Sequence, residues 1–162
     1  MAKLNSSLKN MVMSLAIISF GASAILGGVY ALTKAPIEKA SEAKKTNAIK
    51  EVLPTNANMK IGDPVEISIP SYSEKFIVYP AFENDKLVAV AVETFDNNGY
   101  GGQIKSMVGF DAEGKIVNYA ILSMSETPGL GEKATSWFKT ERNKQDIRGK
   151  NPSEESFKVS KD

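Results

Sequence analysis

The residues best suited to ligand binding form the run ETPGLG, from Glu126 to Gly131. Pro128 fixes one backbone angle and lacks an amide donor, whereas Gly129 and Gly131 can adopt a positive φ and let the backbone approach a ligand closely. A loop with this composition can lie flat against a planar molecule.

The side chains of the same run supply other groups that a planar ring could use. Glu126 and Thr127 offer a carboxylate and a hydroxyl to polar ring edges, and Leu130 offers an apolar surface to a ring face. By spacing alone, a Pro-Gly turn between a strand and a helix is the commoner explanation of such a run. The residues alone therefore leave both interpretations open.

The composition limits the chemistry that this loop could serve. The sequence contains neither cysteine nor histidine, which excludes thiolate iron–sulfur sites, zinc sites of the Cys/His type, histidine-ligated haem and nucleophile pairs that need histidine. Any redox chemistry must therefore be carried by an organic cofactor. Lys and Arg total 20 against 19 for Asp and Glu, so no net field favours nucleic acid as a partner.

An uncharged apolar segment runs from Met11 to Leu32. As a helix it would be about 33 Å long, enough to cross the hydrocarbon core of a bilayer. A cleaved signal peptide is the alternative, with Ala22-Ser23-Ala24 as the cleavage site, but the apolar run exceeds the usual length of about 7–15 residues. We therefore expect an uncleaved transmembrane anchor, whose orientation the flanking lysines do not decide.

Three small residues recur at every fourth position inside this segment: Ser19, Ser23 and Gly27. At helical spacing they share one face, where another helix could approach closely. Glycine and serine are common in membrane helices, so composition alone is the alternative. We interpret the face as a packing surface for a membrane partner.

The rest of the chain predicts an α+β fold, in which a β-rich domain with flanking helices follows the anchor. Pro36 suits the first turn of a separate juxtamembrane helix, which Pro54 should end. Alternating apolar residues and turn signals predict several strands with short connections. Strands are expected at 65–69, 76–79, 87–95, 103–110 and 115–122, with turns at 83–86 and 111–114 and a loop at 96–102.

The end of the sequence predicts a mixture of helix and strand. Trp137 and Phe138 fall in a short helical stretch, and Phe157 and Val159 alternate with polar residues as a strand would. The sequence thus divides into an anchor at 1–33, a juxtamembrane helix at 34–54 and a domain at 55–162.

A longer pattern surrounds the ETPGLG run. The residues Gly99–Gly102, followed by VGFDAEGKIVNYAILSMSETPGLGEKA, resemble the FMN-binding domain shared by the G subunit of Rnf complexes and the C subunit of Na⁺-translocating NADH:quinone reductases. The resemblance covers the anchor, the domain order and nearly the whole chain, and the length is more similar to that of the Rnf G subunit. It implies a subunit that carries electrons through FMN in an ion-translocating ferredoxin:NAD⁺ oxidoreductase complex, and not a complete enzyme.

The resemblance also implies which residues and partners serve the flavin. The residues Glu126, Thr127, Pro128, Gly129, Leu130 and Gly131 would line its ring. Tyr100 could stack on it or anchor its own loop, and Lys133 could offset negative charge on reduced flavin or on the FMN phosphate, although a lysine after a turn is usually only solvated. The implied partners are the other membrane subunits of an Rnf-type complex.

The family attaches FMN through its phosphate to a threonine in an S/T-x-A-T motif, with a separate flavin transferase. That motif is absent from this sequence, which ends at Asp162, so we expect a truncated sequence and assign attachment to none of its threonines. Met124 lies in the SMS segment where many relatives carry histidine, which indicates different tuning of the flavin.

The resemblance further places the domain outside the cytoplasm, on a single-pass protein of the inner membrane. An alternative of another class remains open, because the attachment motif is absent. In that alternative the protein is a membrane-tethered scaffold or binding module that holds no cofactor.

Overall fold

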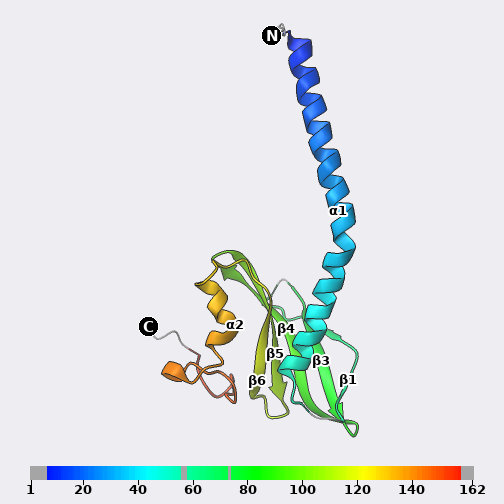
Figure 1. Ribbon diagram of the computed structural model, residues 1–162. Coiled ribbons are helices and arrows are strands. Elements are labelled where there is room, and N and C mark those ends of the chain that lie inside the picture. The colour runs from blue at the N-terminus through cyan, green and yellow to red at the C-terminus, as the bar shows by residue number, and fades with distance from the viewer. Residues whose placement is uncertain (1–6, 56–57, 73, 158–162) are drawn as a thin grey trace. The chain divides into compact units, whose positions relative to one another are not determined.

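The computed structural model describes residues 7–55, 58–72 and 74–157. The chain forms two compact units, Met1–Ala43 and Lys44–Asp162. The helix α1 (Leu8–Val52) contains most of the first unit and contributes its last turns to the second (Figure 1).

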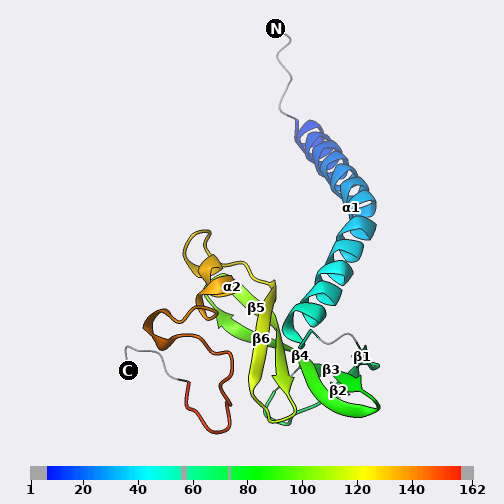
Figure 2. The same ribbon diagram turned by 60° about the horizontal axis from the view of Figure 1, so that its bottom comes forward.

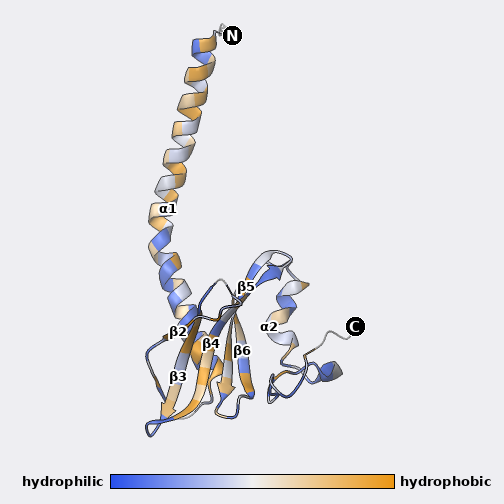
Figure 3. Cartoon of the chain, turned by 180° about the vertical axis from the view of Figure 1, so that it is seen from behind, coloured by the Kyte–Doolittle hydropathy of each residue, from blue (hydrophilic) through white to orange (hydrophobic). Residues whose placement is uncertain are grey.

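The helix α1 is continuous where we expected two helices, so a helix start at Pro36 is wrong. A proline inside a helix removes one backbone hydrogen bond, but its φ fits a helix, and good helix formers such as Ala40 continue the structure beyond it. The helix ends at Val52, two residues before Pro54, as expected. Its N-terminal part is apolar and long enough to cross a membrane, and polar residues gather toward its C-terminal end (Figure 3).

The second unit is built on one antiparallel sheet, so the expected β-rich domain is confirmed. Strands β3 to β6 follow one another in the sheet, and the short strands β1 and β2 both pair with β3 at one edge. The strands are β1 (Lys60–Ile61), β2 (Val65–Ile67), β3 (Phe76–Glu83), β4 (Lys86–Gly99), β5 (Gly102–Asp111) and β6 (Ile116–Ser123). The sequence did not predict β1.

Two of the predicted connections are confirmed, and one is wrong. Asn84 and Asp85 both have a positive φ and form the tight turn between β3 and β4. The β5–β6 turn is closed by Asp111, whose carbonyl accepts a hydrogen bond from the Gly114 amide at 3.1 Å. The expected loop at 96–102 is instead the end of a long β4–β5 hairpin, in which Gly99 pairs with Gly102.

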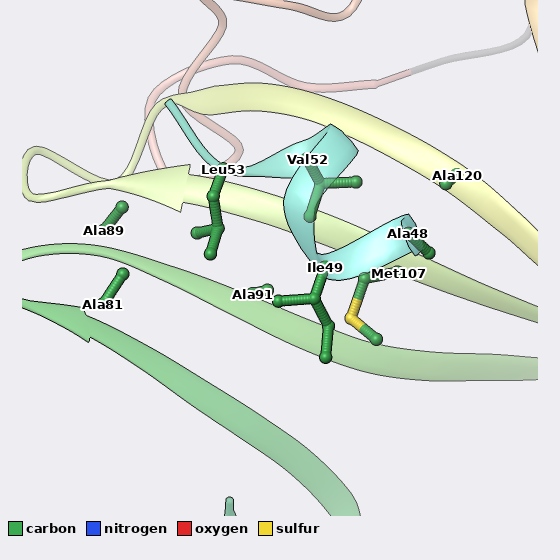
Figure 4. Packing of buried hydrophobic residues seen from close by; sticks show 9 residues of the cluster. All are labelled: Ala48, Ile49, Val52, Leu53, Ala81, Ala89, Ala91, Met107 and Ala120. Atoms are coloured by element: carbon green, nitrogen blue, oxygen red, sulfur yellow. The ribbon is translucent and has the colours of Figure 1, made fainter. Parts of the chain in front are cut away.

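The core of the second unit lies between the last turns of α1 and one face of the sheet (Figure 4). Small sheet residues let the helix approach closely, so that Val52 and Met107 are fully buried. Alternation along each strand places these small residues on one face. They are Ala81, Ala89, Ala91 and Ala120.

Short helical turns follow the sheet. They are η1 (Gly131–Lys133), α2 (Ala134–Trp137) and η2 (Arg142–Lys144), and α2 confirms the helical stretch expected near Trp137. The remaining described chain runs beside β6 without forming a strand (Figure 2), so the strand expected at Phe157 is not found in the described part of the chain. Val159 lies outside the described residues.

Candidate functional site

Two segments distant in sequence meet at one end of the sheet, the tip of the β4–β5 hairpin and the loop after β6 (Figures 1 and 2). The Gly101 amide donates a hydrogen bond to Glu126 Oε1 at 3.1 Å. This contact joins positions 25 residues apart. Glu126 therefore holds the hairpin tip against the loop that carries most of the expected site residues.

The close approach of the two segments requires glycine at position 101. A Cβ atom there would collide with the carbonyl group of Ser125. Any larger residue would have to push the hairpin tip away from the loop and lengthen the contact to Glu126. Glycine at position 101 thus allows the hairpin tip and the loop to lie close together.

The loop itself is a compact turn. The amides of Leu130 and Gly131 both donate to the Thr127 carbonyl at 3.1 Å. Gly129 has a φ of 77°, a region that residues with a side chain rarely adopt, and no atom lies within 4 Å of the position where its Cβ would be. The Cβ side of Gly129 is therefore open and can be approached by a flat molecule, whereas its amide donates to Glu132 Oε2 at 3.4 Å.

The exposed side chains around this turn include two large ones, one apolar and one aromatic. Leu130 is 69% exposed, and Tyr100 at the hairpin tip is fully exposed. Thr127 and Pro128 are exposed as well. An open backbone beside exposed apolar and hydroxyl groups fits a planar ring with polar edges.

Lys133 is the last residue of η1, directly after this turn, and its side chain lines a cleft. The cleft has a volume of about 520 Å³. It lies between α2 and η2, and its lining combines two cations, an aromatic ring and three neutral polar side chains. The lining residues are Lys133, Ser136, Trp137, Thr140, Arg142 and Gln145.

The walls of the cleft are joined by the Gln145 side chain. Its amide nitrogen donates to the Trp137 carbonyl and to Thr140 Oγ1, each at 3.0 Å. Thr140 Oγ1 in turn donates to the Trp137 carbonyl at 2.9 Å. These bonds fix the end of α2 relative to η2.

A tyrosine of the sheet holds α2 in place. The hydroxyl of Tyr119, in β6, donates to the Ala134 carbonyl at 2.6 Å. Burial raises the pKa of Tyr119 above its ordinary value of 10.0, at which the hydroxyl already keeps its proton at neutral pH. The loop and the cleft are thereby connected to the same rigid sheet.

The structure thus divides the residues that we selected from the sequence into two groups. The hairpin tip at Tyr100 and the loop residues 126–131 come together, whereas Lys133 belongs to the cleft. Sequence reasoning missed the partner Gly101 and the cleft residue Arg142. A usable signal for the cleft was the only tryptophan of the chain, Trp137, next to basic residues.

Comparison with known proteins relates this geometry to a family. Residues 99–161 match the FMN-binding domain, a range that begins at the hairpin tip and includes the loop and the cleft. The G subunit of the ion-translocating oxidoreductase complex of Vibrio vulnificus is 30% identical over 167 aligned positions, which cover 98% of this chain and 77% of that protein.

Two further relatives match shorter portions of the chain. The G subunit of the Na(+)-translocating ferredoxin:NAD(+) oxidoreductase complex of Acetobacterium woodii is 33% identical over 137 residues, 76% of this chain. The G subunit of the ion-translocating oxidoreductase complex of Vibrio parahaemolyticus is 44% identical over 64 residues, 37% of this chain. The matched portions span 65% and 30% of the lengths of these two relatives. From the near-complete match to the Vibrio vulnificus protein, we conclude that this chain belongs to the G-subunit family of ion-translocating oxidoreductase complexes, with residues 99–161 as its FMN-binding domain.

Proposed function

We propose that the protein is a membrane-anchored flavoprotein subunit that carries electrons through FMN in an ion-translocating ferredoxin:NAD⁺ oxidoreductase complex. One observation carries the proposal: the range that matches the FMN-binding domain begins where the hairpin tip meets the loop. That meeting point offers an open backbone and exposed apolar groups to a planar ring. When bound, FMN supplies the one- and two-electron chemistry that the side chains of this protein lack.

Different residues of the site would contact different parts of a flavin. Leu130 offers its exposed apolar side chain to a ring face, while Thr127 offers a hydroxyl to a polar edge. Glu126 mainly holds the hairpin tip in place, because its Oε1 accepts a hydrogen bond from the Gly101 amide. Tyr100 is available to cover the ring or to meet another subunit.

The proposed partners and location rest on the family and on the apolar part of α1. The other membrane subunits of an Rnf-type complex are the proposed partners, and a flavin transferase is the proposed maturation enzyme. Ser19, Ser23 and Gly27 form the proposed contact face in the membrane. The proposed location is the inner membrane, where the protein crosses once and carries its domain outside the cytoplasm.

The proposal is tested by the flavin content of protein purified from cells that also produce the complex and the transferase. Visible absorbance of the purified protein should show flavin. In-gel fluorescence after denaturation separates the two modes of binding, because covalent flavin persists and noncovalent flavin is released. Absence of flavin in both assays would leave the scaffold function as the better account.

A further inference from the structure

The short helix α2 is fixed to the sheet and to α1 by contacts at its two ends. At its start, the Tyr119 hydroxyl donates to the Ala134 carbonyl at 2.6 Å. Just after its end, Lys139 Nζ lies 2.7 Å from Glu51 Oε1, a carboxylate in the last turn of α1. The same ammonium group lies 5.0 Å from the centroid of the Tyr119 ring. One lysine therefore contacts both α1 and β6.

The backbone of Lys139 is held as well as its side chain. Its amide donates to the Ser136 carbonyl at 3.1 Å, which closes the turn at the end of α2. Its carbonyl accepts a hydrogen bond from Arg148 Nη2 at 2.7 Å, and Arg148 pairs in turn with Asp146 at 2.6 Å. The Lys139 side chain is only 21% exposed. Contacts with α1, β6 and Arg148 thus fix the position of Lys139.

The loop that carries most of the candidate flavin site leads directly into α2. The Lys133 amide donates to the Leu130 carbonyl at 3.2 Å, and α2 follows η1 without an intervening residue. At this junction Thr135 Oγ1 donates to the Glu132 carbonyl at 2.9 Å. A series of short hydrogen-bonded turns thus connects Leu130 to Lys139, so a displacement of Lys139 would move the end of the loop.

We propose that Lys139 is a positioning residue for the flavin, because its contact with Glu51 ties the loop at 126–131 to the last turn of α1. This inference rests on the proposed flavin function, in which that loop lies against the ring. Lys139 belongs neither to the loop nor to the hairpin tip, and it acts through α2 and η1. Its loss should shift the loop and leave the sheet folded, since Glu51 is 53% exposed and stays solvated without its cation.

Three single variants test the contact. Lys139→Met keeps an unbranched apolar side chain against the Tyr119 ring and removes the charge. Glu51→Gln removes the charge of the other partner and should reproduce the effect of Lys139→Met, and the double variant should add little to either single change. Lys139→Arg keeps the cation and should behave as wild type.

Lys150→Met is the matched control. Lys150 also lies beside a carboxylate and an aromatic ring: its Nζ is 3.9 Å from Glu155 Oε2 and 6.0 Å from the centroid of the Phe157 ring. Both partners belong to the C-terminal segment and not to α1. The control therefore removes the same kind of contact without cutting the link between α1 and the loop.

Hydrogen exchange of the full chain in detergent, measured on peptides by mass spectrometry, reports on the loop without any flavin. The amides of Leu130 and Gly131, which donate to the Thr127 carbonyl, should exchange about fivefold faster in Lys139→Met and Glu51→Gln, the upper range for a partly exposed ion pair. Lys139→Arg and Lys150→Met should match wild type. Peptides from β4 should be unchanged in every variant, which separates a local shift from a loss of global stability.

The bound flavin gives the second readout. Protein is purified from cells that also produce the complex and the transferase, and circular dichroism verifies that each variant is folded. The visible spectrum and fluorescence of the flavin should change in Lys139→Met and in Glu51→Gln. Both should stay as in wild type in Lys139→Arg and Lys150→Met.

The failures of this proposal and of the proposed function are distinguishable. If loop exchange or the flavin spectrum of folded Lys139→Met matches wild type, or if Lys150→Met changes them equally, Lys139 does not position the flavin. Exchange that accelerates in β4 as much as in the loop would assign Lys139 to the stability of the whole domain and overturn the proposal as well. If wild type carries no flavin, the proposed function fails, and the exchange measurement still decides whether Lys139 holds the loop.

Discussion

The geometry of the site depends on Glu126. The sequence predicted that this residue belongs to the site, but it did not predict the partner of its carboxylate. The sequence selected Glu126 for its carboxylate and its place in the ETPGLG run. The structure shows that this carboxylate accepts the Gly101 amide from a separate hairpin. The partner was hidden because the residues before it, from Asp96 to Gly99, are polar and glycine-containing, which is typical of a loop rather than of a strand end.

At this residue scale, Gly101→Ala should destabilise the protein by about 1–3 kcal/mol, because the new methyl group would collide with the Ser125 carbonyl and weaken the contact to Glu126. Chemical unfolding in detergent, followed by circular dichroism, measures the change. The control is the neighbouring Tyr100→Ala, which removes a fully exposed side chain and should stay within about 0.5 kcal/mol of wild type. Equal stability of the two variants would show that the close approach is not needed.

At the scale of elements, turn signals and alternating apolar residues predicted most of the sheet, whereas the continuity of α1 was missed. Pro36 is favourable in the first turn of a helix, whereas inside a helix it removes a backbone hydrogen bond, so the local preference favoured a helix start and the continuity of α1 overrides it. The two-residue strand β1 could not be predicted because its pairing depends on β3 and not on its own pattern. The cleft could not be predicted for a similar reason, since it forms from three short turns.

At the scale of elements, an ion pair between α1 and β4 predicts that the stability of the fold depends on pH. Lys45 Nζ lies 2.8 Å from Glu93 Oε2, and Glu93 is only 16% exposed. The close contact with the Glu93 carboxylate raises the pKa of Lys45 against a smaller effect of burial. A raised lysine pKa stabilises the folded state below the ordinary value of 10.5, and that stabilisation is lost as the pH rises through the folded-state pKa.

We expect Lys45→Gln to lower the free energy of unfolding by about 1 kcal/mol at neutral pH, because a mostly buried carboxylate loses its cation. The variant should also lose part of the decrease in stability that wild type shows above pH 10.5. Denaturant titrations at several pH values measure both effects. Lys75→Gln is the matched control, because its pair with Glu66 is exposed on both sides, and it should change little. A Lys45 variant as stable as the Lys75 variant would contradict the role of the pair.

At the scale of the whole molecule, the apolar segment from Met11 to Leu32 and the β-rich domain were both predictable, because membrane length and strand alternation are strong signals. The sequence alone did not decide which side of the membrane carries the domain, since lysines flank both ends of the apolar segment. The absence of cysteine makes this question open to a direct experiment.

Single cysteines should report the proposed topology. Ala112→Cys lies in the exposed β5–β6 turn, and Ser7→Cys lies just before α1. In intact spheroplasts, a membrane-impermeant maleimide should label the cysteine at 112 and not the one at 7, whereas both should react after lysis. The reverse pattern would place the domain in the cytoplasm.

The central claim is that the loop from Glu126 to Gly131 lies against the flavin ring, and the flavin spectrum and midpoint potential of loop variants test it most directly. Gly129→Val places a β-branched side chain at a φ of 77°, and Leu130→Asp puts a charge on the exposed apolar surface. Both folded variants should change the visible spectrum, fluorescence and potential of the flavin, while the exposed control Glu154→Ala should not. If folded Gly129→Val and Leu130→Asp proteins match wild type in spectrum and potential, the loop does not line the flavin.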